Sequence, residues 1–208
     1  MFAGSLSASG GGLIATQDWD SSSTTFSWEV DFINNLWHYD YHFFAELKSV
    51  DHFLLEVSHG SNSFTNSNIF TGTSNHKGPQ VFGLSDNPNL PEPIYSLNFP
   101  GGSTIPGLVS LAIENFSIVT NRTPVWGDVY GRDDKTDGQD VTFYNAGFGS
   151  PDTDPIDPPS SDSVQFHVLV PDTHDSTPPV PEPSSMLLLT LGFLGSGICF
   201  ARLNPRMS

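Results

Sequence analysis

The stretch TTFSWEVDFINNLWHYDYHFF, residues 24–44, decides the fold class of this chain. Apolar side chains occupy every second position on both sides of Asn34-Asn35, which is the alternation of a strand with one buried face. The buried sets are Phe26, Trp28, Val30 and Phe32 before the turn, and Trp37, Tyr39, Tyr41 and Phe43 after it. We therefore predict a β-hairpin with Asn-Asn at its turn.

Comparable short segments recur along the chain, separated by turn-rich pieces such as FPGGSTIPG, residues 99–107. They lie at residues 51–58, 79–84, 94–99, 108–120, 124–131, 140–148 and 163–170. No helical period of useful length precedes residue 186. The expected fold class is all-β: an antiparallel β-sandwich, jelly-roll or Ig-like, over residues 11–171.

Charge and cysteine content exclude several classes of protein. The chain has 7 basic and 23 acidic residues and a net charge of −16, so phosphate backbones repel it and nucleic acid is not an expected partner. Its one cysteine, Cys199, lies in the apolar tail, so the body has no intramolecular disulfide. The body must be stabilised by its core alone.

The chain ends in a Pro-rich linker, residues 172–180, followed by VPEPSS and an uncharged apolar stretch, residues 186–201. As a single hydrophobic helix this stretch would span about 24 Å, somewhat less than a bilayer core. Arg202 and Arg206 follow it, and positive flanks stay on the cytoplasmic side. We therefore predict a membrane segment at residues 186–201 with the body outside.

The order Pro-Glu-Pro, apolar stretch, Arg resembles the PEP-CTERM sorting signal of diderm bacteria, over residues 181–206. The resemblance implies that Pro181, Glu182 and Pro183 are the recognition motif, that Arg202 is the stop, and that an exosortase is the processing partner. It implies a protein anchored transiently in the inner membrane and then released to the cell surface or the extracellular space.

Members of that family carry a signal peptide, so the resemblance also implies that residues 1–10 are the remnant of a signal-peptide region whose start lies upstream. The body from VWGDVYG to TFYNAGF, residues 125–148, also resembles PEP-CTERM proteins of unassigned activity.

His38, Asp40 and His42 share one strand face and evoke a two-His, one-carboxylate metal site. The two histidine backbones are about 13 Å apart along a strand, so one ion does not take all three side chains. A site would need a pair of them and a further ligand such as His52 or His59. A solvent-facing polar surface is the simpler interpretation.

DDKTDGQD, residues 133–140, resembles a calcium loop only faintly. An EF-hand loop starting at Asp133 would meet Lys135 and Tyr144 at its third and twelfth positions, where acidic or amide side chains are needed. A glycine-containing turn is the better interpretation. Calcium binding that does not use an EF-hand loop remains open, and we expect no other cofactor.

Trp19, Trp37 and Trp126 are candidates for a sugar-stacking platform, although tryptophans in an aromatic-rich sandwich more often lie in the core. Nucleophile-elbow, zinc-protease and phosphate-loop motifs are absent from the sequence, so we do not expect an enzyme. The preferred function is a structural or adhesive protein of the cell surface or extracellular matrix. The alternatives are a carbohydrate-binding module that contacts exopolysaccharide, and a secreted hydrolase with two carboxylates facing across a cleft.

Overall fold

The computed structural model describes residues 1–20, 23–46, 49–59, 63–101, 111–133, 140–149 and 166–171. Within these ranges the chain forms antiparallel strands and two short 3-10 turns, Gln17–Trp19 and Asn66–Asn68. The predicted all-β class is therefore confirmed. None of the helical turns in these ranges has the length and apolar character of a membrane span, and the linker and hydrophobic segment predicted at residues 172–201 lie outside them.

The first sheet has four strands in the order β1-β3-β4-β8. Their bounds are Phe2–Ser7 for β1, Thr25–Ile33 for β3, Leu36–Glu46 for β4 and Leu111–Thr120 for β8. The predicted hairpin is confirmed as β3 and β4. Asn34 and Asn35 both have positive φ, which the tight turn between twisted strands requires and which asparagine tolerates better than most residues.

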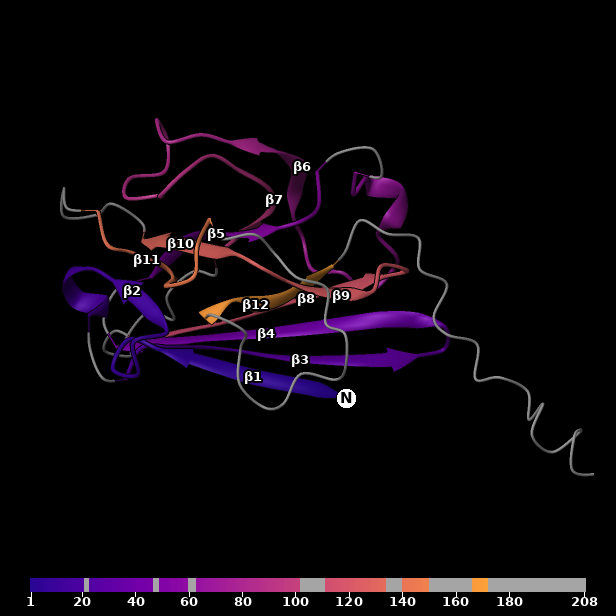
Figure 1. Cartoon of the computed structure of the whole chain (residues 1–208), viewed down its shortest axis with the longest axis horizontal. Helices are drawn as coiled ribbons and strands as arrows, with labels where there is room; N and C mark the ends of the chain where they lie inside the picture. The colour runs from indigo at the N-terminus through magenta and orange to yellow at the C-terminus, as the bar shows by residue number, and fades with distance from the viewer. Residues whose placement is uncertain are drawn as a thin grey trace, which may run out of the picture. The chain divides into compact units, whose positions relative to one another are not determined.

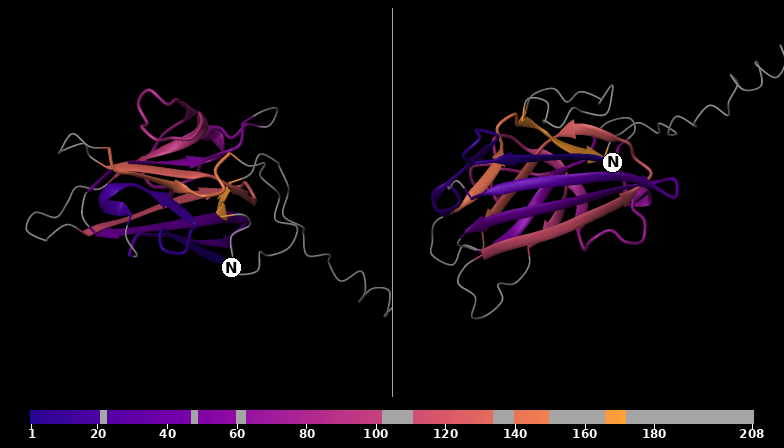
Figure 2. Two further views of the ribbon diagram at one scale, coloured as in Figure 1. Left: turned by 60° about the vertical axis from the view of Figure 1, so that its left-hand side comes forward. Right: turned by 90° about the horizontal axis from the view of Figure 1, so that it is seen from below.

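The second sheet has six strands in the order β2-β11-β10-β5-β7-β6. Their bounds are Leu13–Ala15 for β2, Thr142–Asn145 for β11, Val129–Asp133 for β10, Val50–Glu56 for β5, Ile94–Pro100 for β7 and Lys77–Phe82 for β6. A separate ribbon pairs β9 (Pro124–Gly127) with β12 (Val168–Pro171). Figures 1 and 2 show the two larger sheets as layers, with the β9–β12 ribbon beside them.

The core lies between the two larger sheets and is dominated by aromatic rings. Phe43 of β4 stacks on Phe143 of β11 with ring centroids 4.7 Å apart and an interplanar angle of 7°. Phe116 of β8 stacks on Phe99 of β7 at 4.5 Å and on Phe53 of β5 at 5.1 Å. The two sheets therefore share one core. The choice between a jelly-roll and an Ig-like arrangement stays a prediction.

Two expected boundaries differ from the structure. Residues 2–7 form strand β1, which pairs with β3 and buries Leu6, so the sheet begins before residue 11. The single strand expected at residues 124–131 is two strands, β9 and β10, which belong to different sheets. The chain changes sheet at Asp128, whose buried carboxylate needs hydrogen-bond donors that a regular strand does not supply.

Gly131 of β10 gives a test of the core packing. A Cβ atom at this position would lie 2.3 Å from Cε1 of the fully buried Phe143 ring. We expect Gly131→Ala to lower the free energy of unfolding by about 1–3 kcal/mol, measured by chemical denaturation of the full chain. Gly83→Ala is the control, because a Cβ there meets nothing within 4 Å. Equal stability of the two variants would contradict the packing described.

Candidate functional sites

Trp19 and Trp126 belong to the core and do not form an exposed platform. Their exposed fractions are 0% and 2%. The Trp19 ring makes edge contacts with Phe43 and Phe143, and the Trp126 ring lies edge-on to Trp28 at 6.4 Å. The three-tryptophan platform is therefore not assembled, because Trp19 in the first 3-10 turn and Trp126 on β9 both pack into the core.

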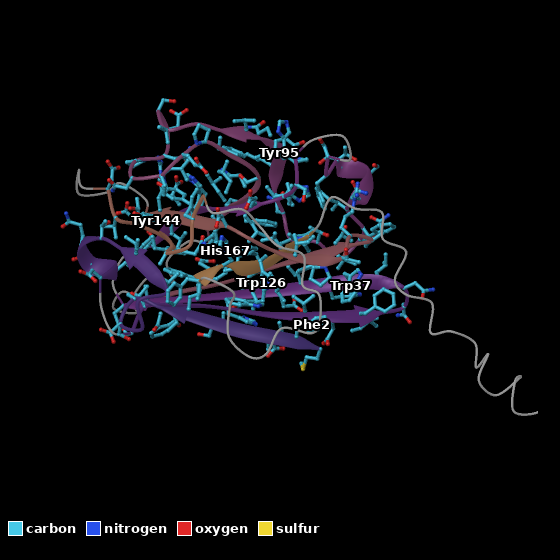
Figure 3. The ribbon with its side chains drawn as sticks, in the orientation of Figure 1. Phe2, Trp37, Tyr95, Trp126, Tyr144 and His167 are labelled. Atoms are coloured by element: carbon cyan, nitrogen blue, oxygen red, sulfur yellow. The ribbon has the colours of Figure 1, made fainter. Side chains whose placement is uncertain are left out.

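Trp37 differs from the other two because it is only partly buried. It lies near the turn of the β3–β4 hairpin, where its ring is 4.9 Å from that of Phe32 and 6.2 Å from that of Phe2. Figure 3 labels Phe2 and Trp37 at the same end of the four-stranded sheet. We call Phe2, Phe32 and Trp37 the hairpin-end cluster.

His38, Asp40 and His42 lie on the outer face of β4, as the alternation predicted, and the latter two are exposed. His42 Nδ1 lies 2.7 Å from Oδ1 of Asn115 on β8. In the described ranges no group of three or more His, Cys, Asp or Glu side chains is placed to hold a metal ion.

The two further histidines considered as ligands lie elsewhere in the fold. His52 is on β5 of the other sheet, and the His59 ring lies 4.6 Å from that of Tyr95. The structure therefore does not bring either of them together with the three residues of β4.

The segment considered for calcium is described only at its two ends, Asp133 and Asp140, and residues 134–139 lie outside the described ranges. Asp133 is fully buried and its Oδ1 accepts a hydrogen bond from the backbone N–H of Val141 at 3.1 Å. The Asp133 backbone N–H donates in turn to the Val141 carbonyl at 2.9 Å. This carboxylate therefore joins the two strands that flank the segment.

A polar cluster that the sequence did not reveal lies on the outer face of β5 and β10. Asp51 Oδ2 accepts hydrogen bonds from Arg132 Nη2 at 2.8 Å and Nε at 3.1 Å. His52 Nδ1 lies 2.9 Å from the same Asp51 oxygen, and its Nε2 lies 2.9 Å from Asn87 Oδ1. We call Asp51, His52, Asn87 and Arg132 the polar clasp.

The polar clasp holds residues 83–90 against the sheet. Asn87 Nδ2 donates to the Gly83 carbonyl at 2.7 Å, and Arg132 donates to the Asp86 carbonyl. Tyr130 Oη donates to the Pro88 carbonyl at 2.8 Å. Beneath lies a second small core, formed by Leu54, Leu90, Ile94 and Tyr130.

The electrostatics of the polar clasp favour an ionised Asp51. Partial burial acts to raise the pKa of Asp51, but the hydrogen bond and charge of His52, together with the charge and hydrogen bonds of Arg132, lower it below the usual 3.8. The carboxylate is therefore negative at neutral pH and holds the Arg132 guanidinium and the His52 ring by hydrogen bonds. Burial raises the pKa of the neighbouring Tyr130 phenol, which stays protonated and donates to the carbonyl of Pro88.

A second polar cluster surrounds Asp128, which is 4% exposed. Asp128 Oδ1 accepts from Asn145 Nδ2 at 2.7 Å, and Oδ2 accepts from the Gly149 N–H at 2.9 Å. The Asp128 N–H donates to Glu56 Oε2 at 2.9 Å. His167, labelled in Figure 3, has Nε2 at 3.5 Å from Asp128 Oδ1.

The sequence contained one signal for this second cluster. Asp128 interrupts the apolar run PVWGDVYG, residues 124–131. In one continuous buried strand its carboxylate would lack hydrogen-bond partners. The partners could not be named, because they come from β5, β11 and the chain before β12.

The described residues thus form an antiparallel two-sheet domain with internally bonded polar clusters. A comparison with protein families finds the PEP-CTERM protein-sorting motif at residues 179–202, outside the described ranges. No curated protein and no solved structure matches the chain. The predicted motif residues Pro181, Glu182, Pro183 and Arg202 all fall within the matched segment, which confirms the resemblance. The motif indicates an exported protein that is anchored transiently in the membrane and processed by an exosortase.

The Asp51 pKa predicts a pH dependence of stability. The pKa of Asp51 in the folded state is below the usual value. Its contribution to the free energy of unfolding is therefore fully present above about pH 3.8 and is lost as the pH falls through the folded-state pKa. We expect Asp51→Asn to be less stable than the parent at pH 7 and the difference to shrink toward about pH 2.5. Chemical denaturation at both values measures this. Asp40→Asn, an exposed control, should show no such narrowing, and a constant difference for Asp51→Asn would contradict the prediction.

Asn145 tests the cluster around Asp128. Its side chain is fully buried, donates to Asp128 and accepts from the Val129 N–H at 2.8 Å. Asn145→Ala removes the acceptor of the Val129 N–H and one donor to Asp128 Oδ1, so we expect a loss of about 1–3 kcal/mol in the free energy of unfolding. The control Asn115→Ala removes an exposed amide and should change stability by less than about 0.5 kcal/mol. Similar losses in both variants would count against the cluster.

Proposed function

We propose that this protein acts as a structural or adhesive component of the cell surface or extracellular matrix once an exosortase has processed it. The observation that carries the proposal is the sorting motif at residues 179–202. Sorting of this kind delivers a folded body to the outside, where a β-rich domain without disulfides relies on its packed core. Exosortase is the proposed processing partner, and exopolysaccharide is the proposed neighbour in the matrix.

The internal bonding of the polar clasp supports a non-catalytic role. Both ring nitrogens of His52 have partners at 2.9 Å, and Asp51 uses the same oxygen for His52 and Arg132. A general base needs a free nitrogen or oxygen within reach of a substrate proton. In the polar clasp these atoms bond to one another, and residues 83–90 are held by His52 Nε2 through Asn87 and by Arg132 through the Asp86 carbonyl.

The carboxylates of Asp128 and Glu56 also support a non-catalytic role. A glycoside hydrolase needs two carboxyl groups on either side of a substrate-accessible bond. Asp128 is 4% exposed, and the Glu56 carboxylate accepts a hydrogen bond from the Asp128 backbone. A pair arranged in this way joins β-strands in the interior, so we propose that the protein is not a hydrolase.

Processing can be tested in the producing bacterium. We expect replacement of Pro181, Glu182 and Pro183 by Ala-Gln-Ala to leave the full-length chain in the membrane fraction, whereas the parent is recovered from the surface or the medium as a shorter chain. Cell fractionation followed by intact-mass spectrometry measures both. Ser184→Ala with Ser185→Ala is the matched control, because it changes adjacent residues outside the Pro-Glu-Pro sequence. Recovery of the parent from the cytosol with Arg206 still attached would overturn the proposal.

A further inference from the structure

His52 of the polar clasp lies between two hydrogen-bond acceptors. Its Nδ1 is 2.9 Å from Asp51 Oδ2, and its Nε2 is 2.9 Å from Asn87 Oδ1. The Asp51 side chain is ionised, because its pKa is below the usual 3.8, so its oxygen accepts and does not donate. A neutral imidazole has one N–H group, and its other nitrogen is itself an acceptor. Both contacts are therefore hydrogen bonds only when the His52 ring carries two protons.

A second contact fixes the orientation of the Asn87 side-chain amide. Its Nδ2 donates to the Gly83 carbonyl at 2.7 Å. If the amide were turned over, its Oδ1 would face that carbonyl oxygen, and two acceptors would be in contact. Asn87 is 3% exposed, so an amide in that orientation would lack water to bond with. Asn87 therefore presents its oxygen, an acceptor, to His52.

Charges from the neighbouring elements act on the His52 ring in both directions. The Asp51 carboxylate, next to it on β5, favours the doubly protonated ring. Arg132 of β10 opposes it, although the Arg132 charge is itself paired with Asp51 Oδ2 at 2.8 Å. On β7 the register partner of His52 is Pro100, which carries no charge.

The remaining titratable groups on this side lie around Tyr130 of β10. The Tyr130 ring is 6.3 Å from the His52 ring, and burial raises the pKa of its phenol, which therefore stays neutral. The charges of Asp133 and Asp140 act on the same phenol, so both carboxylates add negative charge near the polar clasp. The surroundings of the His52 ring thus contain carboxylates as well as one guanidinium.

We infer that the polar clasp is a pH-sensitive closure for residues 83–90, closed while the His52 ring holds two protons and looser once it holds one. Histidine rings exchange this proton between about pH 5 and 8. Closure and the second proton stabilise each other, because only the closed clasp offers the ring two acceptors. Acid therefore favours closure, and a rise in pH loosens it. The inference is independent of the proposed function, since it concerns only the folded body.

Other contacts limit how far residues 83–90 move. Tyr130 donates to the Pro88 carbonyl and Arg132 donates to the Asp86 carbonyl, and neither bond needs the second His52 proton. Leu90, which is 5% exposed, packs in the second small core. The expected change at higher pH is therefore more frequent opening of this segment, while the two sheets stay folded.

Hydrogen exchange of the full chain, followed by mass spectrometry between about pH 5 and about pH 8, tests the inference. Protection is corrected for the intrinsic pH dependence of amide exchange. We expect the protection of residues 83–90 to fall by about tenfold over this range, as for the loss of one hydrogen bond to a charged group. Peptides from β3 and β4 serve as the internal reference, and their protection should stay constant.

His52→Gln removes the titrating ring and should abolish the pH response of residues 83–90. His42→Gln is the matched control, because His42 is an exposed histidine of the other sheet whose Nδ1 lies 2.7 Å from Asn115 Oδ1. This control should respond to pH as the parent does. A parent without any fall in protection, or a His52→Gln variant that keeps the fall, would overturn the inference.

Nitrogen-15 NMR of the histidine rings in the parent gives a second readout, which does not depend on the folding of a variant. The His52 ring should carry two protonated nitrogens at the acid end of the range and one at the alkaline end. The change should coincide with the change in protection of residues 83–90. A His52 ring that stays neutral throughout while this segment remains equally protected would contradict the proposed closure.

Discussion

Stacking of aromatic rings between the two large sheets is the interaction on which the rest of this structure depends. Phe43 and Phe143 lie almost parallel across the core, and Phe116 contacts rings of both β5 and β7. Aromatic side chains remove large apolar areas from water and also prefer defined ring geometries. In a body without cysteine these contacts must supply the stability and hold the two sheets in one relative position.

An aromatic core constrains the polar residues around it. Where the chain passes between sheets, a buried carboxylate is tolerated only if donors surround it, and Asp128 has donors in Asn145 and Gly149. On the outer face, Asp51 accepts a hydrogen bond from Arg132, and Arg132 donates to the Asp86 carbonyl. The pair thereby holds residues 83–90 against the sheet. Groups engaged in this way stabilise the fold.

The inward-facing row of β3 is not buried along its whole length. The same alternating row of β3 supplies Phe26, which is fully buried, and Phe32, which is 40% exposed. A strand that continues past the sheet on which it packs presents core-type side chains to solvent.

The sequence by itself determined the β class, the hairpin at residues 24–44 and the sorting motif, because each depends on local order: a period of two, a turn dipeptide, and a short motif read along the chain. It indicated that His38, Asp40 and His42 share an outer face for the same reason. Only the tertiary structure decided that Trp19 and Trp126 are buried while Phe32 is exposed, and that His52 meets Asn87. Those facts depend on which strands lie opposite one another, and strand pairing across long separations leaves no periodic trace in the chain.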